Sequence, residues 1–285
     1  MVDSTLNQIF NAKMSEGDFN RLSSFIFDQS GIKMPPVKKV MLQSRLQKRL
    51  KELKMTSFKE YADYVFSDEG QKNEIIHMLD VVSTNKTDFF REPVHFDFLV
   101  SNVLPEFNSN KRESNCLKVW SAGCSSGEEP YTIAITLNDY KQNNINFDYS
   151  ILGTDISSQI LQKASLAVYK EERIVNIPLE TKRKYFLKSK DNTKKNVRVV
   201  KDLRNKVIYK RFNFMDEVYN ISESFDIIFC RNVLIYFNRE TQENVIKKLC
   251  GKLKSGGYLF IGHSESIMGM NVPLEQIKPT IFRRI

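Results

Sequence analysis

The sequence predicts a doubly wound α/β sheet that follows a small all-helical domain and carries a small antiparallel β insert. Three observations support this fold class. Roughly the first 84 residues show helical spacing of apolar residues, and from about Leu117 onward short apolar runs alternate with helix-like segments. Between about residues 180 and 202, two short runs flank a polar turn, as in a hairpin. Alternation of strands and helices is typical of a parallel sheet with helices on both faces.

Four helices are expected in the N-terminal part. Ser15 and Asp18 form a capping-box pattern before FNRLSSFIFDQS, and Gly31 stands where that first helix would end. Two prolines, Pro35 and Pro36, begin the second helix. The third, FKEYADYVFS, follows a capping pattern, and the fourth, KNEIIHMLDVV, leads into the loop STNKTDFFRE. The second helix carries an apolar stripe at helical spacing, made of Leu42, Leu46, Leu50 and Leu53.

The rest of the chain is expected to build the sheet. Helix-like segments between its strands include EEPYTIAITLNDY and RETQENVIKKLCGKL. The stretch YFLKSKDNTKKNVRVV is typical of a strand pair; it lacks the glycines of a tight turn, and Asn192 or Asn196 would replace them. The expected parallel strands are LKVW, DYSILGTD, KVIYKRF, FDIIFC and GGYLFIG. The predicted divisions are a helical domain at 1–84, a linker at 85–116, and an α/β domain at 117–285 with the insert at about 180–202.

Composition and charge narrow the classes of protein. The 285 residues are 41% apolar and 27% charged, which is ordinary for a globular protein with one large domain, or a medium one and a small one. The net charge of +9 is uneven: residues 38–54 carry a net +6 and residues 182–211 a net +11, so the remainder carries about −8. This bipolar pattern favours two docking patches for acidic partners over general nucleic-acid binding.

Cysteine, histidine and hydropathy patterns indicate a soluble protein of a reducing cytosol. The four cysteines form no Cys-x-x-Cys pair and the three histidines are scattered, so no zinc-ligand spacing is present and no metal site is predicted. The N-terminal stretch lacks the apolar core of a signal peptide. No run approaches the ~18 apolar residues of a membrane span, so no membrane insertion is expected.

The turn after the first predicted strand, in KVWSAGCSSGEEPYTIAI, is where a doubly wound sheet binds its ligand. Gly123 and Gly127 give only G-x-x-x-G, which is neither the dinucleotide fingerprint nor a phosphate-binding P-loop. Glu128 and Glu129 add negative charge at a helix N-terminus, where a diphosphate would otherwise bind. A capping box of Ser126 with Glu129 would account for the same residues. This stretch alone therefore does not distinguish a helix cap from a ligand-binding turn.

Polar residues at the ends of two other strands favour a binding site. Asp155 closes one apolar run, at a position from which an acid can hold ribose hydroxyls, although a terminal Asp is also a common helix cap. Arg231 and Asn232 follow the fully apolar run FDIIFC, and Tyr236 comes shortly after. Because these strand ends meet at one edge of the sheet, they predict a cleft. A ribose-containing cofactor with a cationic centre and no phosphate is S-adenosylmethionine.

Over nearly its full length the sequence resembles the chemotaxis receptor methyltransferases, the CheR family. The resemblance rests on four motifs in order: TNKTDFFRE (84–92), WSAGCSSGEEPYTIA (120–134), DIIFCRNVLIYF (226–237) and GYLFIGHSES (257–266). It implies an S-adenosylmethionine-dependent protein-glutamate O-methyltransferase with S-adenosylhomocysteine as product and no metal. Its substrates would be glutamates on the cytoplasmic helical domains of methyl-accepting chemoreceptors, whose methyl esters tune adaptation. It would be cytoplasmic, recruited to membrane-bound receptor arrays.

The resemblance also implies roles for individual residues. The TNKTDFFR loop, in the 85–116 linker, would close over the cofactor. Glu129 and Asp155 would hold its methionine amino end or ribose, two roles that the sequence does not rank. Asn213 and Phe214 would flank the adenine, and Tyr236 with Arg91 would face the transferred methyl group as catalytic residues. The full set of implied cofactor-binding residues is Asn85, Thr87, Arg91, Glu129, Asp155, Asn213, Phe214, Arg231 and Asn232.

The expected reaction needs alignment more than activation. A glutamate carboxyl has a reference pKa near ~4.3 and is therefore already a competent nucleophile at cytoplasmic pH. Positioning two reactants can supply ~7–11 kcal/mol of barrier reduction. We therefore assign Arg91 and Arg231 to orientation, expect no obligatory base, and expect Tyr236 to contribute alignment.

The basic helix at 38–54 is the expected receptor-docking surface. Arg45, Lys48, Arg49 and Lys51 are predicted to lie opposite the leucine stripe and to bind an acidic helical partner, although a basic helical face is more often simply solvated. The lysine-rich insert is a second candidate contact, by addition of a receptor strand.

Three other classes of protein remain as alternatives. A nucleic-acid methyltransferase would share the cofactor, but RNVLIYF lacks the prolines usual in a base-flipping turn. A dehydrogenase is disfavoured by the missing third glycine and the acidic helix start. The third alternative is a catalytically silent module that binds the cofactor and tethers receptors. Only an activity assay distinguishes such a module from an enzyme.

Overall fold

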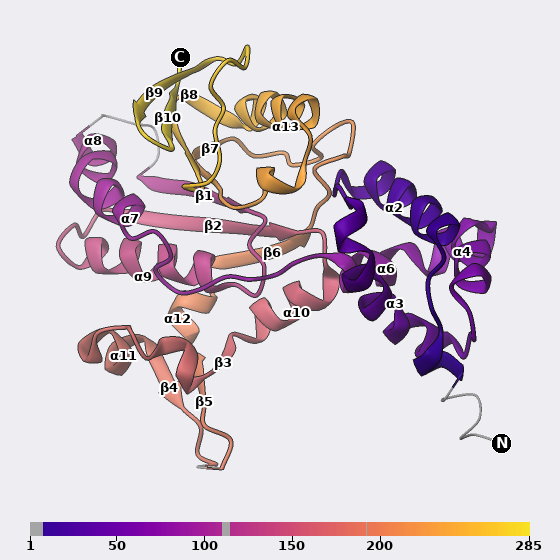
Figure 1. Ribbon diagram of the computed structural model, residues 1–285. Coiled ribbons are helices and arrows are strands. Elements are labelled where there is room, and N and C mark those ends of the chain that lie inside the picture. Colours follow the sequence, from indigo (N-terminus) through magenta and orange to yellow (C-terminus); the bar gives the residue numbers. More distant parts are fainter. Residues whose placement is uncertain (1–7, 110–114, 192) are drawn as a thin grey trace.

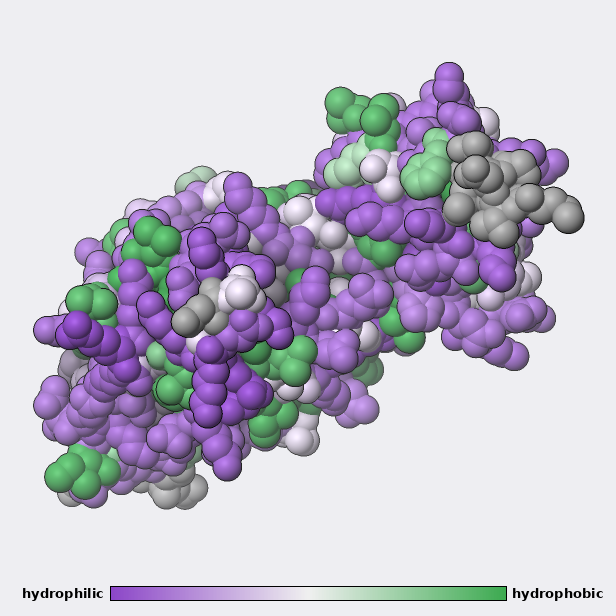
Figure 2. All heavy atoms as spheres, turned by 90° about the horizontal axis from the view of Figure 1, so that it is seen from below, coloured by the Kyte–Doolittle hydropathy of each residue, from purple (hydrophilic) through white to green (hydrophobic). Residues whose placement is uncertain are grey.

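The computed structural model describes residues 8–109, 115–191 and 193–285, and it confirms the predicted fold class. An N-terminal helical domain lies beside a larger α/β domain, from which a small β insert projects (Figure 1). Within the described residues no helix is both long and apolar enough to cross a bilayer. The face shown in Figure 2 is mostly hydrophilic, and its hydrophobic side chains form small separate groups.

The predicted caps of the first and third N-terminal helices are confirmed. A short helix at Asp68–Asn73 was not predicted, and the fourth predicted helix, KNEIIHMLDVV, covers the end of that helix and all of Ile75–Val82. The Ser15 hydroxyl accepts a hydrogen bond from the Asp18 amide, and Gly31 ends the helix in the left-handed conformation with φ 71°. Three leucines of the stripe, Leu42, Leu46 and Leu50, are buried in a core that α2, α3, α4 and α6 share, and Leu53 packs against this core half-buried. The helices are α2 (Glu16–Ser30), η1 (Pro36–Lys38), α3 (Lys39–Leu53), α4 (Phe58–Phe66), α5 (Asp68–Asn73) and α6 (Ile75–Val82).

The described residues form a seven-stranded sheet in the order β6-β2-β1-β7-β8-β10-β9. The five predicted strands are present and parallel, and β7 is buried along its whole length, as its unbroken apolar run indicates. The antiparallel strands β9 and β10 extend one edge and were not predicted. The strands are β1 (Cys116–Ala122), β2 (Asp148–Asp155), β6 (Val207–Arg211), β7 (Phe225–Cys230), β8 (Leu253–Ile261), β9 (Leu274–Lys278) and β10 (Ile281–Arg284).

Helices cover both faces of this sheet. One face packs with Phe96 and Leu99 of the linker and with the apolar side of α9; the other packs with α13. The helical part of the linker contains α7 (Val94–Phe98), the π-helical segment η2 (Leu99–Val103) and α8 (Leu104–Ser109). The crossover segments include α9 (Glu128–Gln142), α10 (Ser158–Leu166), α12 (Lys201–Arg204), η4 (Leu234–Tyr236) and α13 (Arg239–Lys252).

The predicted β insert is a separate three-stranded antiparallel sheet in the order β3-β5-β4. The expected strand pair corresponds to β4 (Phe186–Lys188) and β5 (Asn196–Val199), while β3 (Val168–Lys170) was not predicted. The short helices η3 (Glu171–Ile174) and α11 (Leu179–Tyr185) connect β3 to β4. Of the two proposed turn residues, Asn196 begins β5, and Asn192 lies outside the described residues.

Candidate functional site

The topology creates one switch point, between β1 and β7. The chain runs outward from β1 to β2 and β6, then returns to β7 on the other side of β1. Ligands of doubly wound sheets bind outside the carboxyl ends of strands at such a point. Here a cavity of about 320 Å³ opens between this sheet edge and the N-terminal domain. The N-terminal domain contributes Ser30, Ile32, Met34, Lys38, Met41 and Val82 to its wall.

The structure brings all the proposed cofactor and catalytic residues together on the wall of this cavity. They come from the covering loop, from α9, from the ends of β2 and β7, from the segment after β6, and from η4. Those wall residues are Asn85, Thr87, Arg91, Glu129, Asp155, Asn213, Phe214, Arg231, Asn232 and Tyr236. Their individual roles remain predictions.

Asp155 shapes the turn after β1. Its buried carboxylate accepts hydrogen bonds from the amides of Ser125, at 2.9 Å, and Ser157, at 3.0 Å. Burial raises the pKa of Asp155, although these amides favour the ionised form. Gly123 has φ 85°, and a Cβ there would lie 2.4 Å from Val233, so the turn needs glycine for both conformation and space.

The two glutamates of this turn face different partners. The capping-box interpretation is wrong: Gly127 is the N-cap residue, with no side-chain cap. Glu128 is buried and pairs with Arg173 of the insert at 2.8 Å, so it does not line the cavity as a free charge. Glu129 does line the cavity, and it accepts from Ser121 at 2.6 Å and pairs with Arg231 at 3.0 Å. Burial raises the pKa of Glu129, with Arg231 opposing it.

Arg231 is a buried cation at the centre of the site. It bridges Glu129 and Glu92, and its guanidinium also lies 5.6 Å from the centre of the Phe96 ring. Asn232 adopts φ 58°, a left-handed conformation that Asn tolerates better than most residues. Glu265 fixes this turn by accepting from the amides of Asn232, at 2.9 Å, and Leu234, at 2.7 Å.

Sequence reasoning missed Glu92 and Glu265 as site residues. Both occur in motifs that carried the resemblance, at the end of TNKTDFFRE and within GYLFIGHSES. Their positions in those motifs were the available signal. Their partners are distant in sequence, so no local spacing pattern reveals them.

Side-chain and backbone contacts hold the covering loop over the turn. The Asn85 carbonyl accepts from the Ser125 hydroxyl at 2.9 Å, and the Phe90 amide donates to Thr132 at 3.1 Å. Arg173 also donates to the Thr87 carbonyl. The loop is thereby attached both to the first crossover and to the insert.

The opposite wall joins the two domains. The Asn213 side chain donates to the Gln29 carbonyl of α2 at 2.7 Å, and the Tyr236 carbonyl accepts from the Lys33 amide at 2.9 Å. Lys38 lies with its ammonium 5.9 Å from the centre of the Tyr236 ring. A group that enters beside Tyr236 therefore also meets the N-terminal domain.

The predicted docking face of α3 needs correction. Arg49 is 5% exposed and forms a bidentate ion pair with Glu74 at 2.7 and 2.8 Å, so its placement on an exposed face with the lysines is wrong. It follows Leu46 by three residues and therefore lies on the buried side of the helix. Arg45 is half-buried and donates to the Ser83 carbonyl at 3.0 Å.

A doubly wound sheet whose switch point opens into a cavity with acids at the strand ends defines a cofactor-binding α/β protein. Family comparison specifies it further. Residues 85–282 match the model "CheR methyltransferase, SAM binding domain", and residues 17–83 match "CheR methyltransferase, all-alpha domain". The chain belongs to the CheR methyltransferase family, which confirms the resemblance.

Curated relatives agree with this assignment over most of their length. The chain is 40% identical over 278 residues to the chemotaxis protein methyltransferase of Borreliella burgdorferi, covering 96% of each chain. It is 34% identical over 255 residues to that of Escherichia coli K12, covering 89% of this chain and 85% of the relative. The protein is an S-adenosylmethionine-dependent methyltransferase of chemotaxis.

Proposed function

We propose that this protein transfers the methyl group of S-adenosylmethionine to glutamate side chains on the cytoplasmic helices of chemoreceptors. The observation that carries the proposal is the shared cavity: Lys38 and Met41 of the N-terminal domain face the same space as Arg91 and Tyr236. An acidic helical substrate that reaches this space passes the basic helix α3, since residues 38–54 carry a net charge of +6. The resulting methyl esters would tune adaptation.

The cavity wall suits the cofactor assigned by the family. When bound, S-adenosylmethionine supplies an activated methyl group on a cationic sulfur. The carboxylates of Glu129 and Asp155 are acceptors for ammonium or hydroxyl groups, while Asn213 and Phe214 offer an amide and an aromatic edge to a purine. Asn85, Thr87 and Asn232 supply further polar groups, and Arg231 keeps Glu129 in place.

The residues near the methyl position orient and dehydrate the reactants. The attacking carboxylate is already ionised at neutral pH, so no side chain has to remove a proton from it. Arg91 and Tyr236 align that carboxylate, and the apolar residues Met34 and Ile235 exclude water from it. Because charge is neutralised as the methyl group is transferred, a dry cavity favours the reaction.

The docking surface in this proposal consists of Lys48 and Lys51, which are exposed on α3. Lys48 lies two helical turns from Met41, a residue of the cavity wall, so the two share one side of the helix. Arg45 instead supports the start of the covering loop. The lysine-rich insert is the second contact, and together they would recruit the enzyme to receptor arrays.

Methylation of receptor-containing membranes with methyl-labelled S-adenosylmethionine tests the proposal. Glutamate esters release volatile methanol in mild alkali, whereas methylated lysines and nucleic-acid bases do not. Alkali-labile label on receptor bands is the expected result. Label that is stable to alkali, or that appears on added DNA or RNA, would contradict it.

A further inference from the structure

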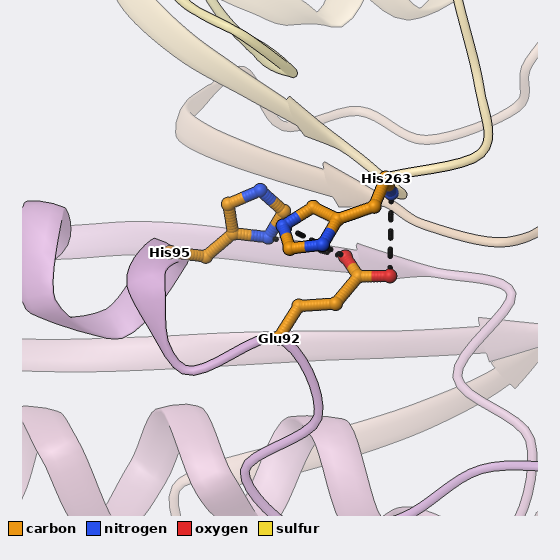
Figure 3. A group of neighbouring side chains, drawn as sticks. All are labelled: Glu92, His95 and His263. Carbon is orange, nitrogen blue, oxygen red and sulfur yellow. Dashed lines mark hydrogen bonds and ion pairs between the residues drawn. The ribbon is translucent and has the colours of Figure 1, made fainter.

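Glu92, His95 and His263 come together at the carboxyl edge of the sheet, although Glu92 and His263 are 171 residues apart. Glu92 ends the TNKTDFFRE loop, His95 lies in α7, and His263 follows β8. Figure 3 shows the Glu92 carboxylate directed toward the backbone of His263 and toward both imidazole rings. The Glu92 oxygen lies 3.6 Å from Nδ1 of His95 and 4.0 Å from Nε2 of His263.

The contacts of Glu92 argue against a metal ion in this group. Its Oε1 accepts from the His263 amide at 3.2 Å and from Nδ2 of Asn232 at 3.4 Å. Its Oε2 accepts from Nη2 of Arg231 at 3.1 Å and from Nε at 3.4 Å. These donors occupy the lone pairs that a metal would need, and the guanidinium already balances the carboxylate charge. Burial lowers the pKa of His95 to about 4, so this ring adds no charge at neutral pH.

We propose that Glu92 is a positioning residue for cofactor binding: its carboxylate joins the covering loop to Arg231 and to the end of β8. Arg231 lines the cavity and reaches Glu129 with its Nη1 at 3.0 Å, while its Nη2 donates to the Arg91 carbonyl. Glu92 therefore fixes the guanidinium on the side opposite Glu129. One carboxylate aligns Arg231 and also holds the segment that carries Arg91.

The backbone of the covering loop supports this role independently. Phe90 and Glu92 both adopt left-handed conformations, with φ 53° and 55°, on either side of Arg91. Such conformations are unfavourable for residues other than glycine and persist only where surrounding contacts enforce them. In this turn Arg91 lies at the cavity wall while Glu92 reaches Arg231. Without the Glu92 contacts, the turn loses the interactions that offset its strain.

The test compares Glu92→Gln with a matched control, Glu106→Gln. Glu106 also pairs with an arginine, Arg283, and accepts from Tyr258 at 2.6 Å, but it does not line the cavity. Glu92→Gln should weaken binding of S-adenosylhomocysteine about 10- to 100-fold, the usual range for losing a hydrogen bond to a charged group. Amide hydrogen exchange in residues 85–92 should accelerate as well. Glu106→Gln should lower thermal stability without either effect.

Three results would overturn the proposal. The first is an affinity of Glu92→Gln within about twofold of wild type. The second is an equal loss of affinity in both variants, because the effect would then be general destabilisation. The third is a stoichiometric zinc ion, bound by wild type and lost in Glu92→Gln, which would make the carboxylate a metal ligand. If Glu92→Gln does not fold, Glu92→Asp replaces it in the same comparison with Glu106→Gln, because it keeps the charge but shortens the side chain by one methylene. The same three results would then overturn the proposal.

Discussion

Removal of the Arg49 side chain should destabilise the N-terminal domain and not merely its docking surface. The side chains of Arg49 and Glu74 are 6% and 2% exposed. In Arg49→Ala the Tyr61 hydroxyl, at 3.0 Å, is the hydrogen-bond donor that the described residues still offer to the Glu74 side chain. Removing one partner of a buried ion pair typically costs about 3–5 kcal/mol.

Arg49→Ala should therefore lower the free energy of unfolding by about 3–5 kcal/mol at pH 7. Urea unfolding followed by circular dichroism measures the helices, while fluorescence of Trp120, the single tryptophan, reports on the sheet. The control Lys48→Ala, at an exposed neighbour, should change stability by less than about 0.5 kcal/mol. Wild-type stability in Arg49→Ala together with selective loss of receptor methylation would refute this reasoning and return Arg49 to the docking surface.

Four further outcomes are expected. Asp155→Asn should weaken S-adenosylhomocysteine binding about 10- to 100-fold in calorimetry, whereas Asp148→Asn, at the other end of the same strand, should not. Burial alone would raise the pKa of Asp148, but hydrogen bonds from two lysines lower it to about 2. Asp148→Asn should therefore lower the melting temperature at pH 7, and this effect should disappear as the pH falls toward 2. Tyr236→Phe should slow methylation less than about 10-fold without changing the shape of the pH–rate profile. If the wild-type rate instead falls sharply below neutral pH, and Tyr236→Phe removes that fall, the tyrosine acts as a base. Lys48→Glu with Lys51→Glu should raise KM for the receptor and leave cofactor affinity unchanged; equal losses would exclude docking.

Local signals made much of the fold predictable. The turn after β1 was recognisable because Gly123 and Gly127 follow an apolar run and precede a helix, and the caps at Ser15 and Gly31 act within a few residues. β3 was missed because three residues that pair with a distant strand leave no periodic pattern. Short edge strands depend on tertiary pairing more than on their own sequence.

The site was predictable in its members but not in their pairing. Strand ends identified Asp155 and Arg231 because parallel strands deliver their carboxyl ends to one edge. The partner of Arg231 was not predictable: Glu92 lies 139 positions away, and the packing of the linker on the sheet determines the contact. Arg49 was assigned to the exposed face of α3 because its charge was given more weight than its position in the helical repeat. That position places it on the same side of the helix as Leu46 and Leu50.

Negative charge at the turn after β1 does not explain the choice of cofactor. Glu128 and Glu129 each face an arginine, so neither is a free negative charge at the helix start. The charged residues of the cavity wall are of both signs, namely Lys38, Lys86, Asp88, Arg91, Glu129, Asp155 and Arg231. Net negative charge therefore cannot be what excludes a diphosphate.

We expect the occupied amide of Ser125 to exclude a diphosphate instead. A phosphate-binding turn works through free backbone N–H groups, but here the Asp155 carboxylate already accepts from the Ser125 amide, at 2.9 Å. A diphosphate would have to displace the buried Asp155 carboxylate from this amide. A ligand with hydroxyl or ammonium groups can instead donate hydrogen bonds to the same carboxylate. NADH and ATP at millimolar concentration should therefore fail to displace S-adenosylhomocysteine in a competition titration, and displacement by either would show that the turn still binds phosphate.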